Sequence, residues 1–526
     1  MQITILDIKL KENLTEHDIL SFVYKKYNIK TKNIIDGKLV KKSLDLRVKN
    51  DPYYIYQVVL ELKKEERNNP KLHNKHVKFD TTYSDTIDVK KIKYNQRPLI
   101  VGAGPAGLFC AYILAMANLK PIVFEQGKMV KDREKDIELF FNENILNEDS
   151  NICFGEGGAG TFSDGKLNTS LSDPRIKFIL KTFVKFGAKE SLYYDNMPHV
   201  GTDKLRICME NMRNEIISLG GDFHFNSKVI DVKSNYIKVK ENDELLEYSS
   251  SHIILAIGHS AKETFQMLYK NGFNLEPKAF SMGARIEHLQ KNINDMQYGL
   301  NSNIHDAASY KAAVHLPDRD VYTFCMCPGG MVVASSTKKN TIVTNGMSYE
   351  ARNMVNANSA VLVNVKISDF YIDSPLDGLY FQEKVERACY EVSNSYRAPV
   401  NLLKEFFADE VATSFRTVLP TYPNKTIFAS FNNILPEFVI KGLKDGIREI
   451  AKKLKGFDDD DAILTIVESR SSSPVRILRN EYMSNIYGVY PIGEGAGYAG
   501  GITSSALDGI KCALKIIEDI CGGALC

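Results

Sequence analysis

The sequence predicts an α/β protein: a Rossmann-type dinucleotide-binding domain, an α+β domain inserted into it, and a small N-terminal α+β domain of the ferredoxin-like kind. Three observations predict this fold. From Arg97, RPLIVGAGPAGLFCAYILAMANLKPIVFE has the apolar strand, glycine turn, apolar helix and second strand of a βαβ unit. Another strand, glycine turn and helix follow near the C-terminus, in GVYPIGEGAGYAGGITSSALDGIKCALKI. The chain of 526 residues is too long for one ordinary core, so two or three domains are expected.

Residues 1–95 are expected to form the small N-terminal domain. ITILDIKL is typical of a strand, EHDILSFVYKKYNI of an amphipathic helix, and SLDLRVK with YIYQVVLEL of a β-hairpin. The segment 1–97 carries 21 Lys and Arg against 13 Asp and Glu. This basic excess is either a surface for nucleic acid or another partner, or a set of solvated lysines. The second interpretation is favoured, because no aromatic-rich RNA-binding signature accompanies the charge.

The rest of the chain divides by its motifs. Residues 96–274 are predicted to be the first part of the dinucleotide-binding domain, with a helix at 203–219 and short strands in GGDFHF, KVIDVK, YIKVK and HIILAIG. Residues 275–465 mix strands and helices without nucleotide motifs, which indicates an inserted substrate or cap domain. Residues 466–526 return to motif-rich sequence and are expected to complete the dinucleotide-binding domain.

The composition excludes several classes of protein. Hydrophobic residues make up 44% and charged residues 25% of the chain, as in ordinary globular proteins. The net charge of +2 is too small for a strong overall field toward nucleic acid or an anionic membrane. No stretch reaches the roughly 20 apolar residues that span a bilayer, and MQITILDIKLKE lacks the apolar run of a signal peptide. Nine cysteines, an odd number, are typical of reduced thiols, so a cytoplasmic location is expected.

The strongest motif is the glycine turn GAGPAG between the first strand and helix of the βαβ unit. Gly102 permits the tight turn, Gly104 lets the backbone approach a pyrophosphate, and Gly107 lets helix and strand pack closely. The helix N-terminus offers unpaired N–H groups to the anion. Glu125 ends the next strand, where a carboxylate can accept the ribose hydroxyls. The predicted dinucleotide-binding residues of this unit are Gly102, Gly104, Pro105, Ala106, Gly107, Glu125 and Gln126.

The C-terminal glycine turn identifies the dinucleotide. GVYPIGEGAGYAGGITSSALDGIKCALKI resembles the second FAD fingerprint of the glutathione-reductase-type flavoproteins, in which a carboxylate near a strand end binds the ribitol. Glu494 takes the position that is often Asp in that superfamily. HIILAIGHSA resembles the superfamily's internal strand-and-glycine motif, and Arg133 matches an arginine that commonly reaches the FAD phosphates. The predicted FAD-binding residues added here are Arg133, Val229, Gly258, Gly493, Glu494, Gly500, Gly501 and Ile502.

Six motifs together resemble one family. They are FGEGGAGTFSDGKL, PHVGTDKLR, FCMCPGGMVVASS, VTNGMS, ESRSSSPVRI and GEGAGYAGGI, and they spread over nearly the whole chain. They resemble the long bacterial proteins described as FAD-dependent dehydrogenases, which carry a small N-terminal α+β domain. The resemblance implies non-covalently bound FAD and a redox fold, and it brings no known substrate.

A glycine-rich loop at 154–165 is also assigned to the cofactor. Its glycines, including Gly158 and Gly160, leave few side chains, which allows backbone N–H groups to approach a ligand closely. This loop and the segment 495–504 are therefore predicted to lie against the isoalloxazine. A flexible surface loop is the alternative.

Three residues are candidates for the chemistry itself. Cys325 and Cys327 form a CxC pair whose side chains share one face of an extended strand, and a dithiol there can exchange electrons with flavin. Packing is the alternative, since buried cysteines are common, and a metal site is disfavoured because partner ligands are lacking. His199, in a Pro-His-Val-Gly turn, is either a proton donor or a hydrogen-bonded structural histidine.

Other charged or reactive residues have competing interpretations. Glu468, Arg470 and Arg476 are suited to bind an anionic substrate or the pyrimidine edge of the flavin, or else to form an internal salt-bridge network. The acidic run 458–461 follows KKLKGF and is expected to be a solvated turn, so no metal is predicted. Cys153 stands alone near the first glycine motif, without the CxxxxC that flavin disulfide reductases carry there.

The predicted function is that of an FAD-dependent oxidoreductase acting on a small molecule in a cleft between the flavin domain and residues 275–465, with His199, Cys325 and Cys327 on the pocket walls. No second complete GxGxxG unit with an acid is visible, so NAD(P)H, a candidate electron donor, must dock without that fold, or another donor serves. Two alternatives stay open: a flavin-containing RNA-binding or RNA-modifying factor that uses the basic N-terminal domain, and an FAD sensor without turnover. No membrane partner is expected, nucleic acid is disfavoured, and the oligomeric state is not predicted.

Overall fold

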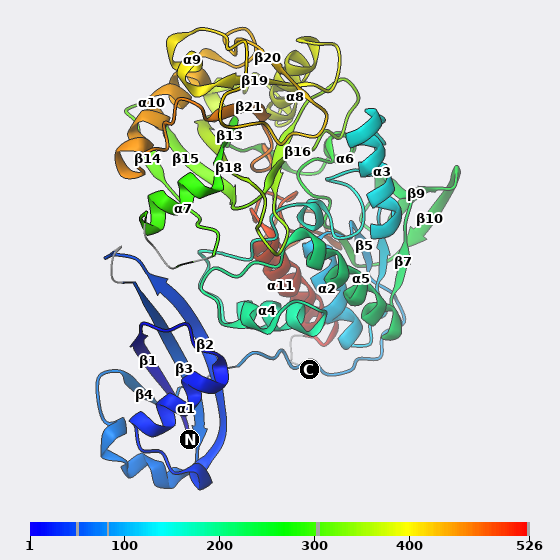
Figure 1. Ribbon diagram of the computed structural model, residues 1–526. Coiled ribbons are helices and arrows are strands. Elements are labelled where there is room, and N and C mark those ends of the chain that lie inside the picture. Colours follow the sequence, from blue (N-terminus) through cyan, green and yellow to red (C-terminus); the bar gives the residue numbers. More distant parts are fainter. Residues whose placement is uncertain (49–51, 82–83, 301–303, 305, 523–526) are drawn as a thin grey trace.

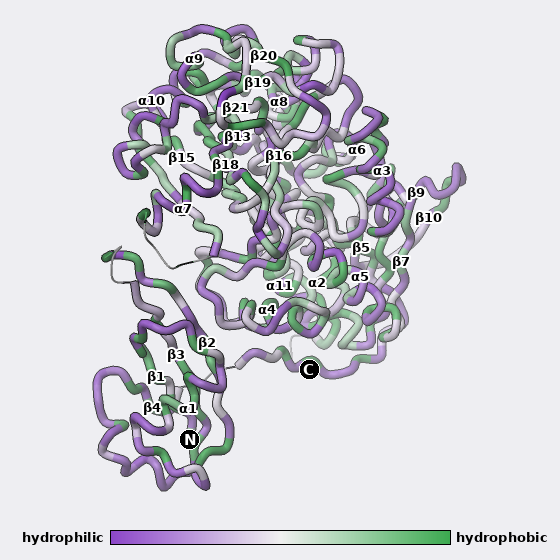
Figure 2. The backbone as a smooth tube through the Cα atoms, in the orientation of Figure 1, coloured by the Kyte–Doolittle hydropathy of each residue, from purple (hydrophilic) through white to green (hydrophobic). Residues whose placement is uncertain are grey.

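The structure is a computed structural model that describes residues 1–48, 52–81, 84–300, 304 and 306–522 (Figure 1). The N-terminal domain stands apart as a lobe at the lower left, the parallel sheet with its helices lies at the lower right, and the inserted domain lies at the top. Hydrophobic segments run through the interior of the two larger regions (Figure 2). Among the described residues, no helix combines the length and the apolar character needed to cross a membrane.

The N-terminal domain is a four-stranded antiparallel sheet, in the order β2-β3-β1-β4, with one helix. Its strands are β1 (Gln2–Leu10), β2 (Ile34–Asp45), β3 (Tyr53–Leu62) and β4 (Val77–Phe79). Helix α1 (Glu16–Lys26) begins after Thr15, whose hydroxyl accepts the N–H of Asp18 at 3.3 Å. The arrangement follows the β-α-β-β order of a ferredoxin-like domain, but short 3-10 turns at 64–68 and 70–72 stand where that fold has a second helix.

The first strand of the hairpin lies earlier than the sequence predicts. SLDLRVK is expected to form it, but β2 covers Ile34–Asp45 and runs through Asp36 and Gly37, which are typical of a turn. Two β-bulges, between Ile34 and Asp36 and between Leu39 and Lys41, keep this edge strand paired with β3. The last residue of the predicted strand, at position 49, lies outside the described residues.

The second region is built on a five-stranded parallel sheet in the order β23-β11-β5-β6-β7. Its strands are β5 (Leu99–Val101), β6 (Ile122–Phe124), β7 (Asp222–His224), β11 (Ile253–Leu255) and β23 (Val489–Pro491). The strands nearest the centre are apolar throughout, as expected where both faces of a parallel sheet are covered. Strand β23, near the C-terminus, completes the sheet that begins at Leu99, which confirms a mixed α/β fold with a Rossmann-like domain.

Several helices cover one face of this sheet, and a small antiparallel sheet together with one helix, α6 (Lys262–Lys270), covers the other. The helices of the region are α2 (Pro105–Met116), α3 (Val130–Glu143), α4 (Arg175–Lys185), α5 (Thr202–Ser218), α6 (Lys262–Lys270) and α11 (Ile502–Ile520). The antiparallel sheet contains β8 (Ser227–Val232), β9 (Tyr236–Glu241) and β10 (Glu244–Ser249). Helices α2 and α11 approach each other closely, because a Cβ on Gly509 would lie 2.1 Å from the carbonyl oxygen of Ala106.

The inserted domain is a seven-stranded, mostly antiparallel sheet in the order β14-β15-β18-β13-β21-β19-β20. Its strands are β13 (Phe280–Leu289), β14 (Ala313–His315), β15 (Asp320–Cys327), β18 (Asn356–Val365), β19 (Ala398–Leu402), β20 (Thr426–Phe428) and β21 (Ile463–Glu468). Its helices are α7 (Gln290–Tyr298), α8 (Asp377–Glu391), α9 (Leu403–Ala408) and α10 (Glu437–Lys453). The predicted domain boundary at residue 465 falls inside β21.

Two short strand pairs extend this architecture. Strands β16 (Met331–Ala334) and β17 (Thr344–Met347) form a hairpin, and β12 (Leu275–Pro277) pairs with β22 (Val475–Ile477) where the chain enters and leaves the inserted domain.

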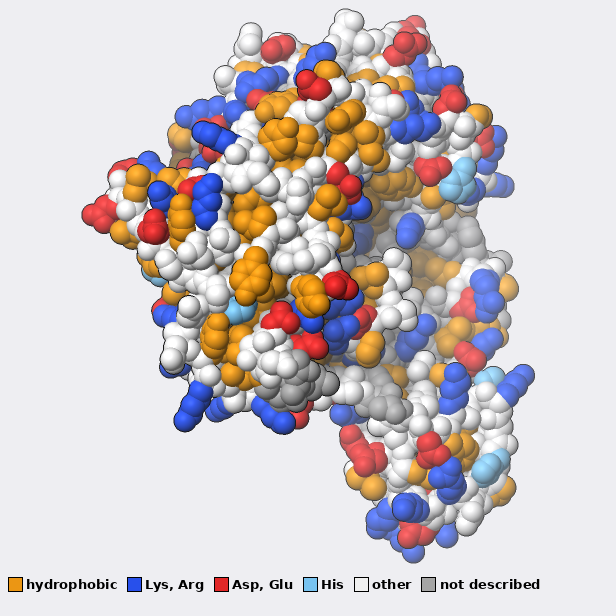
Figure 3. All heavy atoms as spheres, turned by 180° about the vertical axis from the view of Figure 1, so that it is seen from behind, with side chains coloured by type: hydrophobic (Ala, Val, Ile, Leu, Met, Phe, Trp, Pro, Cys, Tyr) orange, Lys and Arg blue, Asp and Glu red, His pale blue; other side chains and the backbone are white. Residues whose placement is uncertain are grey.

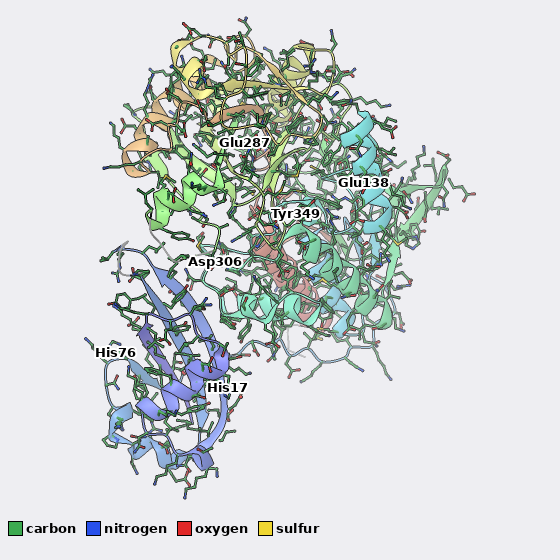
Figure 4. All side chains as sticks on the ribbon, in the orientation of Figure 1. His17, His76, Glu138, Glu287, Asp306 and Tyr349 are labelled. Atoms are coloured by element: carbon green, nitrogen blue, oxygen red, sulfur yellow. The ribbon has the colours of Figure 1, made fainter. Side chains whose placement is uncertain are left out.

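Glu287 lies buried in the inserted domain (Figure 4), where it accepts hydrogen bonds from Asn356 and Thr421 and where burial raises its pKa. The core of the inserted domain therefore contains a satisfied polar group beside its apolar residues.

Candidate functional site

A cavity of about 430 Å³ lies where the parallel sheet meets the inserted sheet. Part of its lining follows directly after the ends of β5, β6 and β11, at the carboxyl edge where open α/β sheets bind their ligands. Another part belongs to β15, β17 and β21 of the inserted domain. The cavity therefore joins the sheet that carries the glycine motifs to the domain expected to bind substrate.

Most of the predicted cofactor-binding residues line this cavity. The lining includes Gly102, Gly104, Pro105, Ala106, Glu125, Gln126, Gly158, Gly160, Val229, Gly258, Glu494, Gly500, Gly501 and Ile502. Three predicted residues, Gly107, Arg133 and Gly493, are not part of the lining. Two motifs almost 400 positions apart, GAGPAG and GEGAGYAGGI, thus meet at one site.

The glycines outside the lining serve the packing around the cavity. A Cβ on Gly107 would lie 2.0 Å from the carbonyl oxygen of Gly102, so this position admits no side chain. Gly493 has a φ of +74°, and its N–H donates to Asp508 at 2.8 Å. A Cβ on Gly104, in contrast, would approach no atom more closely than 3.9 Å. Gly104 is therefore free of the protein's own packing and open to a ligand.

The geometry suits a bound FAD. Helices α2 and α11 both begin at the cavity, after Gly104 and Gly501, and helix N-termini favour a pyrophosphate. Cβ atoms on Gly258, Gly500 and Gly501 would meet nothing within 4 Å, so the backbone there is open to a ligand. Glu494 lines the cavity, with its Oε1 3.5 Å from Nδ1 of His259.

Glu125 holds three glycine-rich segments together. Its Oε2 accepts the N–H of Ala103 at 2.9 Å, and its Oε1 accepts those of Gly127 at 3.0 Å and Gly155 at 2.9 Å. Each carboxylate oxygen has two lone pairs, so Oε2 can still accept a ribose hydroxyl. The sequence predicts the ribose contact alone, whereas the structure gives Glu125 a structural role as well.

The structure corrects the role predicted for Arg133. Its guanidinium is fully buried and donates to the carbonyl oxygens of Asn151, Ile152, Glu156 and Gly158 at 2.7–3.0 Å. The side chain does not line the cavity. Arg133 therefore holds the glycine-rich loop from behind instead of contacting a phosphate.

Strand β15 is irregular at Cys325. This residue has a φ of +41°, a left-handed conformation that residues with a side chain rarely adopt, and the pairing with β18 shifts register between Phe324 and Cys327. The CxC pair is therefore not a regular extended segment as predicted. Cys325 lines the cavity, whereas Cys327 is buried and outside the lining. Strained backbone of this kind is often found at functional sites.

The two cysteines interact directly, because the Cys327 thiol donates to the backbone carbonyl of Cys325 at 3.2 Å. The nearby Cys327 side chain and the charges of Arg285 and Lys166 lower the pKa of Cys325, although burial opposes the shift. Burial and the neighbouring Cys325 sulfur raise the pKa of Cys327. Nη1 of Arg285 also donates to the Cys325 carbonyl at 2.8 Å. Cys325 is thus the thiol that ionises more readily, whereas Cys327 stays protonated and donates to the Cys325 carbonyl.

The charged residues near the C-terminal motifs form internal salt bridges. Arg285 and Glu468 are joined by two hydrogen bonds of 2.8 Å in the buried core. The other two pairs are Arg470 with Glu386 at 2.7–2.8 Å and Arg476 with Glu276 at 3.1 Å. Glu468, Arg470 and Arg476 were expected either to bind a ligand or to form internal salt bridges, and in the structure they form salt bridges. Glu468 and Arg470 also line the cavity.

His199 lies behind the cavity wall, which corrects its predicted position on the wall. Its Nε2 is 3.5 Å from Oδ1 of Asp164, and Oδ2 of Asp164 is 3.4 Å from Nζ of Lys166. His199 and Asp164 are buried, and Lys166 lines the cavity. Burial lowers the pKa of His199; Lys166 and His199 lower the pKa of Asp164 against the effect of its own burial. His199 therefore reaches the cavity only through Asp164 and Lys166.

Sequence reasoning missed several lining residues. Lys166 and Asn345 lie in the FSDGKL and VTNGMS motifs, so the sequence contained a signal for them, whereas Lys311 lies in a segment without a motif. Cys153 also lines the cavity, but burial raises the pKa of its thiol, as expected for an unreactive cysteine. Among the described residues seven cysteines are free thiols, whereas Cys521 is disulfide-bonded and departs from the expected reduced state. No cluster of metal-binding side chains is present among the described residues.

Comparison with known proteins identifies the family. A Clostridium beijerinckii protein of unassigned function is 42% identical over 510 residues, which cover 94% of this chain and 95% of that protein. The chain belongs to the same family as this clostridial protein. A family profile described as "FAD-dependent protein, C-terminal domain-like" matches residues 279–471, and one described as "NAD(P)-binding Rossmann-like domain" matches residues 100–130. This chain is an FAD-dependent oxidoreductase, and FAD is its cofactor.

Solved structures resemble the chain more distantly. A flavoprotein/dehydrogenase from Cytophaga hutchinsonii is 14% identical, with 82% of this chain and 80% of that chain covered and a TM-score of 0.36. CtdE in complex with FAD is 13% identical, with 80% and 85% covered and a TM-score of 0.33. A geranylgeranyl bacteriochlorophyll reductase-like protein from Thermoplasma acidophilum is 11% identical, with 81% and 79% covered and a TM-score of 0.34. These similarities are too weak to support an inference.

Proposed function

We propose that this FAD-dependent oxidoreductase binds a small-molecule substrate in the part of the cavity that the inserted domain lines. The observation that carries the proposal is that Cys325 and Asn345 line the same cavity as the two glycine motifs. A substrate held by the inserted domain would therefore lie against the residues proposed to bind FAD. FAD, when bound, exchanges two electrons with a substrate.

Cys325 is the proposed catalytic residue. Its lowered pKa favours a thiolate that can accept a proton from the substrate and return it, and the charges of Arg285 and Lys166 contribute to that lowered pKa. Cys327 and His199 are proposed as positioning residues, because neither lines the cavity. His199 acts through Asp164, whose carboxylate orients Lys166 toward the cavity.

The substrate is proposed to be an anion. Lys166 and Lys311 both line the cavity, Lys166 is close enough to Cys325 for its charge to lower the pKa of that thiol, and among the described residues Lys311 forms no ion pair. Two ammonium groups in one concave pocket attract a carboxylate or phosphate. The apolar side chains of Phe324 and Met326, also in the lining, would exclude water from the rest of the substrate.

NAD(P)H is proposed as the electron donor. The profile match to an NAD(P)-binding domain covers only the glycine unit that we assign to FAD, so NAD(P)H would bind elsewhere. We further propose a place in the glutathione-reductase-type superfamily, supported by the paired glycine motifs, and a cytoplasmic location, supported by the seven free thiols. The RNA-modifying alternative has only the basic N-terminal domain in its favour.

Anaerobic reduction of the FAD-loaded protein tests the proposed function. NADH, NADPH and a panel of small carboxylates and phosphate esters are added, and the visible absorbance of oxidised FAD is followed. We expect one donor and one anionic substrate to change the absorbance, and Cys325→Ala to slow the substrate step by about 10²-fold or more. Cys389→Ala, in a buried position of α8 outside the cavity, is the matched control and should react like the wild type.

Two results would contradict the proposal. A full rate in Cys325→Ala would show that the thiol takes no part in the reaction. If no donor or substrate changes the absorbance, while the protein captures RNA in a manner that depends on residues 1–95 and weakens with salt, the RNA-binding alternative is correct.

A further inference from the structure

A second cavity, of about 310 Å³, lies between the N-terminal domain and the FAD-binding domain. Val40, Lys41 and Gln57 line it from strands β2 and β3. The rest of its lining comes from the segments 167–180 and 194–198. We propose that this interdomain cavity binds a phosphate group of a small molecule through Lys41 and Lys177.

The walls of the interdomain cavity are held by backbone hydrogen bonds across the domain boundary. The N–H of Lys42 donates to the carbonyl of Tyr194 at 2.7 Å, and the N–H of Asn196 donates to the carbonyl of Lys42 at 2.8 Å. The edge strand β2 is therefore paired with the segment 194–196 and does not expose free backbone groups there. The two domains thus form one fixed cavity rather than a variable gap.

Lys177 is the unusual residue of this cavity. Its Nζ donates to the carbonyl oxygens of Val40 and Tyr193, both at 2.8 Å, and the bulge of β2 at Val40 leaves that carbonyl free to accept. An ammonium group has three N–H donors, so one remains for a ligand. Burial, supported by the charge of Lys41, lowers the pKa of Lys177 to about 8. An anion in the cavity would offset both effects and favour the charged form.

Neither lysine has a carboxylate partner within the described residues. Asp85, whose charge acts on the pKa of Lys177, is engaged by Lys181 at 2.9 Å and by the hydroxyl of Tyr193 at 2.8 Å. Asp195, on the cavity wall, is hydrogen-bonded to Ser191. The charged groups that act on the pKa of Asp195 are Lys42, Lys189 and Asp306. Asp306 is labelled in Figure 4. Lys41 and Lys177 therefore have no ion pair of their own among the described residues, and burial, which raises the pKa of Asp195, favours the neutral form of the one carboxyl group on the cavity wall.

The remaining polar lining suits a phosphate. Gln57, Asn168, Thr169 and Asn196 add amide and hydroxyl groups that can donate to several oxygens at once. Lysine binds phosphate as a point charge, and two lysines share the charge of a phosphate better than that of one carboxylate. The volume lies within the range of small-molecule sites and exceeds that of a single ion.

The interdomain cavity is adjacent to the larger cavity. Asn168 lines both, and it lies in the segment 166–169, which also contributes Lys166 to the larger cavity. The carbonyl of Leu167 accepts the hydroxyl of Thr503, in the first turn of α11, at 2.7 Å. A hollow above the N-terminal lobe is visible from behind (Figure 3). The phosphate belongs either to a free ligand or to a larger molecule, such as a pyridine dinucleotide, that extends toward the larger cavity.

Binding of inorganic phosphate, pyrophosphate and NADPH to the FAD-loaded protein tests this inference by titration calorimetry. FAD must be bound so that its own site does not accept the anions. We expect saturable binding of at least one of them, weakened about tenfold or more by Lys41→Gln and by Lys177→Gln. Lys181→Gln, on the same helix but paired with Asp85 and outside the cavity, is the matched control and should bind like the wild type.

Four outcomes are decisive. The absence of saturable binding of all three compounds to the wild type overturns the inference, and so does equal binding by Lys41→Gln, an exposed residue whose loss leaves the interdomain contacts intact. Tighter binding of NADPH than of pyrophosphate identifies a dinucleotide, whereas equal affinities identify a free phosphate ligand. Binding is measured without turnover, so failure of this inference is distinct from failure of the proposed reaction.

Discussion

Substitution of Gly104 by alanine should weaken FAD binding, whereas substitution of Gly107 by alanine should destabilise the fold. A methyl group on Gly104 would lie 3.9 Å from the nearest atom, the Cα of Gly158, so the fold accommodates it. Gly104 caps α2 with a φ of −76°, and alanine is a poorer cap than glycine by about 1 kcal/mol or less. The methyl group projects into the space proposed for the pyrophosphate. We expect Gly104→Ala to bind FAD at least about tenfold more weakly, a loss of ~1.4 kcal/mol.

The substitution Gly107→Ala should destabilise the fold itself. Its methyl group would lie 2.0 Å from the carbonyl oxygen of Gly102 and 3.2 Å from the carbonyl carbon. These are backbone atoms of the turn and cannot move away as a flexible side chain would. Separating α2 from β5 to relieve such overpacking costs about 1–3 kcal/mol.

Two measurements separate these effects. FAD affinity is measured by titration of the FAD-free protein, and stability by urea unfolding of the same FAD-free samples, because bound FAD stabilises the folded state by mass action. Unchanged FAD affinity in Gly104→Ala would show that the pyrophosphate does not approach this turn. A urea midpoint for Gly107→Ala equal to that of the wild type would show that helix and turn are less closely packed than described.

Three further predictions concern residues around the cavity. Glu125→Ala should lower both FAD affinity and the urea midpoint of the FAD-free protein, since each charged hydrogen bond contributes about 1.5–3 kcal/mol; a change in FAD affinity alone would contradict its structural role. Cys327→Ala should raise the pKa of Cys325, so that alkylation of Cys325 by iodoacetamide, measured by peptide mass spectrometry, shifts to higher pH, whereas Cys389→Ala leaves the profile in place; an unshifted profile would show that Cys327 does not lower the pKa of Cys325. Burial lowers the pKa of His199 below its ordinary 6.5, so protonation favours the unfolded state and stability decreases as the pH falls below 6.5; the urea midpoint of His199→Gln should decrease less between pH ~7 and ~5.5, and an equal decrease would refute this linkage.

The sequence predicts the dinucleotide-binding unit well because its signals are local. The apolar strand, the glycine turn and the helix that begins at Pro105 all lie within 20 residues, and each glycine has a steric reason visible in the motif. The strands and helices of the parallel sheet follow from the same hydrophobic periodicity. The second glycine motif could be paired with the first because their order matches that of flavoproteins.

The roles of single side chains were harder to predict because distant contacts decide them. Arg133 contacts the backbone at 151–158, and the position of His199 depends on Asp164. The sequence around Arg133 and around His199 gives no sign of these contacts. The register shift of β15 at Cys325 arises from pairing with β18, so the CxC spacing alone suggested a regular strand. The neighbouring sequence does not distinguish Lys177 from other lysines. Its hydrogen bonds to the carbonyl oxygens of Val40 and Tyr193 become visible only in the structure.

The parallel sheet brings together strands from the two ends of the FAD-binding domain, which affects how the protein is made. During synthesis, β5, β6 and β11 emerge from the ribosome long before β23, the edge strand that pairs with β11. The apolar face of α2 likewise stays uncovered until α11, the last helix described, has been synthesised. The N-terminal domain and the inserted sheet contain their own strands and can fold earlier, as domains do on the ribosome. A nascent chain should therefore acquire FAD only after its C-terminal segment has been released.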